Sequence, residues 1–252
     1  GAISDEGQGF GITINAFGES GRTLVLTGTN SFTGSTDVSS GKLLIEGVVS
    51  GPVQVRGGAI LGGSGRISGA TDAQPGSIVA PGTSIGAMHT GDITFQNGSN
   101  LDIHLGGVAS GSYDQIKAEG TVTLQDANLN LTLGYTPVNG DSFTLIDNDG
   151  EETALGLGTF RVNGASIPDG GTFQVGNVRF VMNYTAGSNN NDVVITVQEF
   201  TTEIGLDGSG NLLVADIVSG GKSDTLNIST DISNSKLIIS DPANILGATN
   251  II

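Results

Sequence analysis

The chain has 252 residues, of which 25 are acidic and only nine are Lys or Arg, so its formal net charge is −16. This charge argues against binding nucleic acid or anionic lipid, because both need a basic protein surface. No cysteine is present, which excludes disulfide bonds and cysteine-based metal or redox sites. No apolar run reaches about 18 residues, so we expect no membrane-spanning helix. The 42 glycines, combined with many Val, Ile and Leu, indicate a folded chain with numerous turns.

Residues 24–45 contain two short apolar runs, at 24–26 and 43–45, joined by Thr, Asn, Ser and Gly. Corresponding residues of the two runs lie about twenty positions apart, close to what a parallel β-helix uses for one turn. Each run is therefore predicted to be a strand of a successive coil. Helical periodicity is nearly absent from the chain.

From residue 47 to residue 86, very short apolar segments alternate with single or paired glycines. Such segments are too short to be stable alone, and we expect each to stack on the coil before it. The apolar residues are Val53, Val55, Ile60, Leu61, Ile67, Ile78 and Val79.

Apolar and polar residues then alternate between residues 93 and 133, which is typical of strands with one face in a core. The predicted core residues are Ile93, Phe95, Leu101, Ile103, Leu105, Val122, Leu124, Leu129, Leu131 and Leu133. The predicted solvent-facing residues are Asp102, His104, Thr121, Thr123, Asn128, Asn130 and Thr132. We also expect core or stacking positions for Phe32, Phe95, Phe143, Phe160, Phe173 and Phe180.

We expect coils of roughly twenty residues to stack from about residue 20 to residue 200. The strand-turn rhythm recurs at 211–217, 224–230 and 235–241. We therefore divide the chain into a solenoid, residues 1–199, and a β-rich extension or the start of a further repeat block, residues 200–252.

Residues 24–36 closely resemble the autotransporter-associated β-strand repeat of bacterial surface proteins. The matching residues are Leu24, Leu26, Thr27, Gly28, Asn30, Phe32, Thr33, Gly34 and Thr36. A Gly-Gly-Ser-Gly stretch and an Ala-Pro-Gly-x-Ser-x-Gly element fit the same family, and the likeness continues across two thirds to three quarters of the chain. These further segments are residues 62–65, 80–86, 113–116, 120–133, 140–147 and 191–197. The resemblance implies an all-β, right-handed parallel β-helix (β-solenoid) of the passenger type.

Asp102 and His104 share a strand face, where they could form a proton-transfer pair or half of a metal site. Their place on the solvent face of an alternating strand favours an ordinary exposed role, and the second histidine, His89, is expected in a turn. No GxSxG segment is present to support a nucleophilic serine. We read the basic residues as isolated, without the acid and base groove of a polysaccharide lyase; these residues are Arg56, Arg66, Lys117, Arg161 and Arg179.

Two segments superficially resemble calcium loops. Residues 187–196 contain one copy of a pattern that binds calcium only in tandem, and residues 147–152 lack the later acidic ligand of an EF-hand. The acidic residues Asp147, Asp149, Glu151 and Glu152 are therefore read as solvated loop charges. We predict no catalytic, cofactor-binding or metal-binding residues.

We accordingly expect a non-enzymatic structural or adhesive passenger fragment of a large bacterial cell-surface or secreted protein. It would be extracellular, and its partner would be an unidentified surface or glycan receptor. The alternatives are a polysaccharide-active β-helix enzyme and a calcium-stabilised surface-layer component. No pattern in the sequence indicates an oligomer.

Overall fold

The structure, a computed structural model, describes residues 2–16, 21–149 and 158–199, together with the backbone of five strands between residues 202 and 248. The chain divides into two compact units, Gly1–Val197 and Gln198–Ile252. Every regular element within the described residues is a strand, which confirms the all-β fold class. No helix among them is long and apolar enough to cross a membrane.

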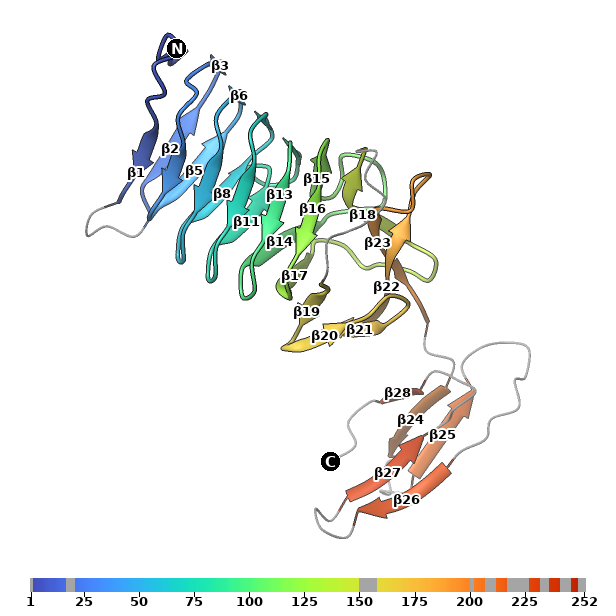
Figure 1. The fold of residues 1–252 in the computed structure, drawn as a ribbon. Coiled ribbons are helices and arrows are strands. Elements are labelled where there is room, and N and C mark those ends of the chain that lie inside the picture. The colour runs from blue at the N-terminus through green and yellow to red at the C-terminus, as the bar shows by residue number, and fades with distance from the viewer. Residues whose placement is uncertain are drawn as a thin grey trace. The chain divides into compact units, whose positions relative to one another are not determined.

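The first unit begins with six coils, each of which gives one strand to each of three sheets (Figure 1). Sheet A contains β1 (Ile12–Ile14), β4 (Thr36–Val38), β7 (Val53–Val55), β10 (Thr71–Ala73), β13 (Ile93–Phe95) and β16 (Val122–Leu124). Sheet B begins with β2 (Thr23–Leu26), β5 (Lys42–Ile45), β8 (Ile60–Gly63), β11 (Ile78–Pro81), β14 (Asn100–Leu105) and β17 (Ala127–Leu133). Sheet C includes β3 (Thr29–Asn30), β6 (Val48–Val49), β9 (Arg66–Ile67), β12 (Ala87–Thr90), β15 (Gln115–Ala118) and β18 (Ser142–Asn148).

Consecutive coils pair in parallel, as a solenoid requires. The two runs identified in the sequence are strands β2 and β5, and Leu24 is the register partner of Leu43. In sheet A, Thr36 pairs with Val53 and Val53 pairs with Thr71, so the coil repeat there is 17 or 18 residues. The predicted parallel β-solenoid is thus confirmed for this part of the chain.

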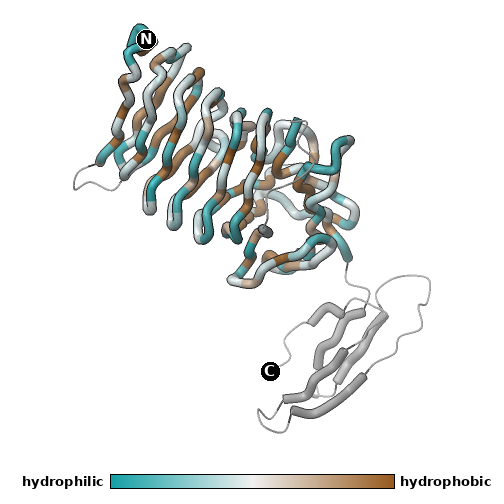
Figure 2. Tube along the Cα trace, in the orientation of Figure 1, coloured by the Kyte–Doolittle hydropathy of each residue, from teal (hydrophilic) through white to brown (hydrophobic). Residues whose placement is uncertain are grey.

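Inward-facing side chains of successive coils stack on one another inside the solenoid. In sheet B the register places five aliphatic residues in one row, each no more than 2% exposed: Leu43, Leu61, Val79, Leu101 and Leu129. The six phenylalanines predicted for the core are all buried. Apolar and polar positions alternate along each coil (Figure 2), so burial of the inner row supplies the main stabilisation.

The predicted core residues Leu131 and Leu133 are only partly buried, in contrast to Leu129 of the same strand. The following strand pairs with β17 only at Ala127 and Asn128. Beyond these two residues no strand covers the far half of β17 in the described part of the chain. The prediction was therefore correct for the alternation but wrong for the depth of burial at the end of the strand.

The complete parallel coils end with β18, and β19 (Phe160–Val162) adds one further parallel strand, so the coils do not continue to residue 200 as expected. Residues 158–197 instead form β19, β20 (Ala165–Ile167), β21 (Thr172–Val175), β22 (Val178–Ala186) and β23 (Asp192–Val197). β19 extends sheet B in parallel, but β20 pairs with it antiparallel. β23, β22 and β21 extend sheet C as antiparallel strands. The β19–β20 hairpin is closed by the two-residue turn Asn163-Gly164, in which both residues have positive φ, as such turns favour.

The backbones of adjacent coils approach closely at the corners. At the corner between sheets B and C, a Cβ atom added to Gly47 would overlap the backbone of Gly28, and one added to Gly65 would overlap the carbonyl of Gly47. Only glycine fits these positions. The glycine spacing read from the sequence therefore reflects close approach between coils as well as turn geometry.

Two residues of the motif at 24–36, Phe32 and Asn30, are buried inside the first coil. Phe32 is 1% exposed in the core, and Asn30 is fully buried. The Asn30 side chain donates a hydrogen bond from Nδ2 to the Val48 carbonyl of the next coil, and its Oδ1 accepts one from the Ile3 amide. This amide therefore joins three segments that are distant in the sequence.

Asp5 fastens the segment before β1 to the same coil. Its carboxylate accepts hydrogen bonds from the backbone amides of Gly7, Gly9 and Phe10, and from both the amide and Oγ1 of Thr33. These donors, the Thr33 amide foremost, lower the pKa of Asp5 to about 2.

The second unit contains β24 (Thr202–Leu206), β25 (Leu212–Asp216), β26 (Asn227–Asp231), β27 (Lys236–Ser240) and β28 (Leu246–Ala248). β24 lies between β25, which is antiparallel to it, and β28, which is parallel. β26 and β27 form a separate antiparallel pair. Strands β25, β26 and β27 overlap the three runs identified after residue 199.

We expect Gly47→Ala to lower the free energy of unfolding by about 2–3 kcal/mol, because the added methyl group would overlap backbone that cannot move aside. Gly107→Ala is the matched control, since a Cβ there meets only the Ser112 side chain at 3.4 Å or beyond. Urea unfolding of both variants measures the difference. Equal stability of the two variants would contradict the close approach.

We expect Asp5→Asn to lower the melting temperature at pH 7, because one amide oxygen replaces two carboxylate oxygens as acceptors. The folded-state pKa of Asp5, about 2, lies below its ordinary value. The carboxylate therefore stabilises the fold above about pH 4 and loses this effect as the pH falls toward about 2. As the pH falls over that interval, the melting temperature should decrease less in the variant than in the wild type. The same acid sensitivity in both proteins would show that Asp5 is not the titrating group.

Candidate functional site

The outward face of β14 carries Asp102 and His104, the pair considered in the sequence. Both side chains are partly exposed, and Asn130 of the next coil donates a hydrogen bond from Nδ2 to Asp102 Oδ1 at 2.8 Å. His89 lies on strand β12 of sheet C rather than in a turn, so the two histidines belong to different sheets. The structure therefore brings no second histidine to this face.

A small hollow of about 150 Å³ lies beside these residues and is lined by Lys42, Ala80, Pro81, Gly82, Thr83, Ser84, Asp102, Ile103, His104, Asp114 and Thr132. Asp114 is 3% exposed and accepts hydrogen bonds from the backbone amides of Gly86 and His104 at 2.9 and 2.8 Å. Burial raises the pKa of this carboxyl group. Asp114 thus fastens the loop at residues 82–86 to β14. Within the described residues, no hydrogen bond joins the His104 imidazole to a hydroxyl group or a carboxylate.

The acidic residues at the end of β18 form local pairs. Asp147 forms an ion pair with Lys117 at 3.4 Å, and Asp192 accepts a hydrogen bond from the Asn148 amide at 2.9 Å. Burial, with a smaller contribution from the charges of Asp147 and Asp149, raises the pKa of Asp192. Glu151 and Glu152 lie outside the described residues. In the described ranges, no three His, Asp or Glu residues are placed to hold a metal ion.

Arg56 and Arg66, which were read as isolated, form ion pairs with acidic residues of other coils. Arg56 makes a bidentate pair with Asp37 of the preceding coil, which lowers the pKa of Asp37. Arg66 pairs with Glu119, which lies 53 residues later in the sequence. These cations therefore connect stacked coils on the outside of the solenoid.

The corner between sheets B and C differs from the other two because its loops are longer in the fourth, fifth and sixth coils: two residues separate the strands in the second and third coils, then five, nine and eight. Counted between register-matched residues, and so including the ends of the strands, the path from sheet B to sheet C takes six residues in the second and third coils, then 11, 17 and 19. The residue pairs are Lys42 and Val48, Ile60 and Arg66, Ile78 and His89, Asn100 and Lys117, and Asn128 and Asp147. The same count from sheet A to sheet B is six or seven in every coil from the second to the sixth.

We call residues 82–86, 106–113 and 134–140 the display corner. These residues include no charged side chain, although the whole chain has a net charge of −16. Val108 and Val138 are 50% and 62% exposed in the second and third loops. The loops adjoin one another, since a Cβ on Gly106 would meet the Ile85 side chain and a Cβ on Gly134 would meet Gly106. The result is a surface of uncharged residues with two exposed valines, bordered by the partly exposed Asp141 and by the His104 imidazole.

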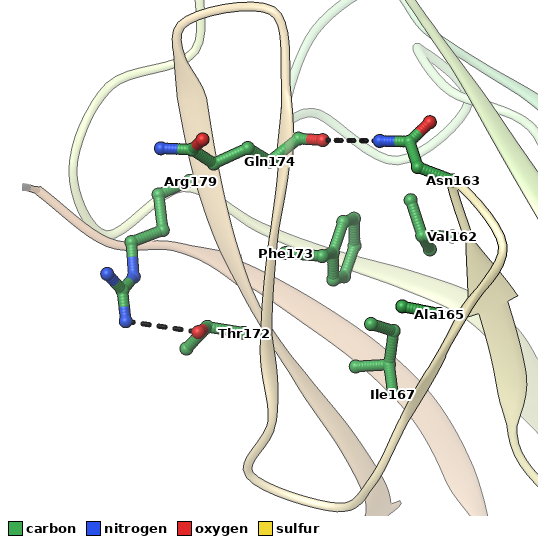
Figure 3. A pocket seen from close by; sticks show the side chains of 8 residues that line it. All are labelled: Val162, Asn163, Ala165, Ile167, Thr172, Phe173, Gln174 and Arg179. Carbon is green, nitrogen blue, oxygen red and sulfur yellow. Dashed lines mark hydrogen bonds between the residues drawn. The ribbon is translucent and has the colours of Figure 1, made fainter. Parts of the chain in front are cut away.

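A second hollow, of about 480 Å³, lies between the hairpins β19–β20 and β21–β22 (Figure 3). We call it the hairpin groove, and its lining residues are Val162, Asn163, Ala165, Ile167, Thr172, Phe173, Gln174 and Arg179. Phe173 points toward the other hairpin and stacks on Phe180, with ring centroids 5.5 Å apart. Sequence reasoning did not identify this groove, although the Asn163-Gly164 dipeptide is a strong hairpin signal.

Tyr184 of β22 holds the first hairpin in place. Its hydroxyl group accepts a hydrogen bond from the Phe160 amide at 2.8 Å and donates one to the Ile167 carbonyl at 2.9 Å. The ring also stacks on Phe160. Burial raises the pKa of Tyr184 to about 12, so the hydroxyl group stays protonated at neutral pH.

The chain shows a limited similarity to a known extracellular protein. No protein-family model matches the chain. Over 112 residues, or 44% of its length, the chain is 34% identical to a protein described as an extracellular serine protease of Serratia marcescens. The matched segment covers about 10% of that protein. The chain is thus similar to a small part of a much larger extracellular protein.

We expect Tyr184→Phe to lower the free energy of unfolding by about 2 kcal/mol, because it leaves the buried Phe160 amide and Ile167 carbonyl without the bridging hydroxyl group. Tyr113→Phe serves as the control, since Tyr113 packs edge-on against Phe143 through its ring. Urea unfolding compares the two variants. If Tyr184→Phe lowers the free energy of unfolding no more than the control does, the hydroxyl bridge contributes nothing to stability.

Proposed function

We propose that the protein is a non-enzymatic, structural and adhesive part of a larger bacterial protein that acts outside the cell. The stacked coils form a rigid support, and the display corner makes contact with a surface or glycan receptor. The observation that carries this proposal is the growth of the loops at one corner only. A chain selected for stacking alone has no need to lengthen its loops in three successive coils at the same corner.

The chemistry of the display corner supports an uncharged partner. Glycans offer many hydroxyl groups, and the corner offers backbone amides and uncharged side chains, with Val108 and Val138 available for apolar contact. Exposed apolar residues rimmed by polar ones are typical of interaction sites. Charged receptors are less suitable, because the display corner has no ion-pairing group of its own.

The similarity to an extracellular protein supports the proposed location. It does not extend the protease activity to this chain, since the matched segment covers about a tenth of that protein. We propose no proteolytic role for the His104 face, because within the described residues its imidazole makes no hydrogen bond to the hydroxyl groups of Thr83 or Ser84, which line the same hollow. We therefore infer a binding role rather than catalysis.

We expect the fluorescently labelled chain to bind at least one member of a panel of immobilised neutral glycans and extracellular matrix proteins. The double variant Val108→Ser, Val138→Ser should bind about tenfold more weakly, because two exposed apolar contacts are lost. Phe10→Ser is the matched control, since Phe10 is 67% exposed but lies before the first coil.

Failure to bind any surface in the panel would contradict the adhesive role. Equal weakening by Phe10→Ser would show that the display corner is not the contact. Release of reducing ends from the same glycans, abolished by His104→Ala, would show that the chain is an enzyme.

A further inference from the structure

The hairpin groove is bordered by two uncovered strand edges. β20 is the last strand of sheet B, and β21 is the last strand of sheet C, among the strands that the structure describes. Residues of both strands line the groove (Figure 3). An uncovered edge presents N–H and C=O groups that can pair with a further strand.

Hairpin geometry determines which groups of β21 face the groove. Val175 and Val178 flank the two-residue turn and form a hydrogen-bonded pair, and the next such pair is Phe173 with Phe180. The N–H and C=O groups of Thr172 and Gln174, which lie between these positions, therefore point away from β22 and toward the groove. By the same rule, Ser166 presents its backbone groups at the free edge of β20.

One of these edge groups is already engaged by a side chain. Asn163 donates a hydrogen bond from Nδ2 to the Gln174 carbonyl oxygen at 3.4 Å. The Asn163 amide thus takes the position that a backbone N–H of an added strand would take. This distance is longer than that of an ordinary N–H···O hydrogen bond, so displacing the Asn163 amide gives up only a weak bond.

The two faces of an added strand would meet different surroundings. On one face lie Phe173, Val162 and Ile167, all apolar and no more than 7% exposed. On the other face lies Arg179, the register partner of Gln174, which donates a hydrogen bond to Thr172 Oγ1 at 3.0 Å. Arg179 is the one charged residue that lines the groove, in a chain with a net charge of −16.

We propose that the hairpin groove binds an extended peptide whose side chains alternate between apolar and acidic, by adding a strand to the edge of β21. The apolar side chains pack on Phe173 and its neighbours, and a carboxylate lies beside Arg179. The backbone of the peptide pairs with Thr172 and Gln174 and displaces the Asn163 side chain. The hairpin groove and the display corner are separate sites, so the binding proposed for one can be disproved without affecting the other.

The test is fluorescence anisotropy of the full chain with a labelled, end-capped heptapeptide of alternating Val and Glu. We expect saturable binding, and no binding of the peptide that carries Lys in place of Glu. N-methylation at every second residue removes the backbone donors of one edge of the peptide. Of the two methylated forms, the one that blocks the edge facing β21 should bind at least about tenfold more weakly than the unmodified peptide.

Three variants locate the site. Arg179→Gln should weaken binding about fivefold. Arg161→Gln should leave it unchanged, because the Arg161 guanidinium donates to the Gly164 carbonyl and does not line the groove. Asn163→Gly keeps a residue suited to positive φ and frees the Gln174 carbonyl, so it should tighten binding.

Absence of saturable binding by the wild-type chain would overturn the proposal. So would equal affinity for the unmodified peptide and both methylated forms, since the backbone would then take no part. Equal weakening by Arg161→Gln and Arg179→Gln would show that the attraction is not located in the groove. The peptide comparisons use the wild-type chain and therefore do not depend on the folding of any variant.

Discussion

Adjacent coils of the solenoid lie one strand spacing apart, about 4.8 Å, and this distance constrains the rest of the structure. Inside the stack, it places equivalent side chains in contact, as in the row from Leu43 to Leu129. At the corners, it brings backbone against backbone, which leaves no room for a Cβ at Gly47 or Gly65. On the outside, it brings opposite charges such as Arg56 and Asp37 within hydrogen-bonding distance.

The same constraint explains why the differences in loop length are concentrated at one corner. A loop that leaves the stack between two strands escapes the close approach, so it can lengthen without disturbing the strand register. At the corner between sheets B and C, the glycine contacts from Gly28 to Gly65 give way to the three loops of the display corner. Asp114 and Asp141 hold two of these loops by accepting backbone hydrogen bonds from Gly86 and Val138, which keeps the long loops ordered on a rigid support.

The sequence was sufficient to predict the coil because its apolar spacing and its glycines both follow from coil stacking. Leu24 and Leu43 were correctly matched, and the alternation from residue 93 to residue 133 was correct except for the burial of Leu131 and Leu133.

The antiparallel end of the first unit was missed, since its strands have the same alternation and differ only in their turns, at Asn163-Gly164 and Gly176. The pairing of Arg66 with Glu119 was also missed, because residues 53 positions apart meet only through stacking.

The register of the stacked coils is tested most directly by cysteine cross-linking, because the chain has no cysteine of its own. Gln54 and Asp72 are register partners on adjacent coils, whereas Thr94 is the partner of Asp72 one coil further on. One strand spacing falls within the Cα separation that a disulfide tolerates, and two spacings, about 9.6 Å, exceed it. We expect the variant with Gln54→Cys and Asp72→Cys to lose its free thiols on mild oxidation of the folded protein, and the variant with Gln54→Cys and Thr94→Cys to keep them. Retention of free thiols by the first pair, or equal cross-linking of both pairs, would contradict the stacked register.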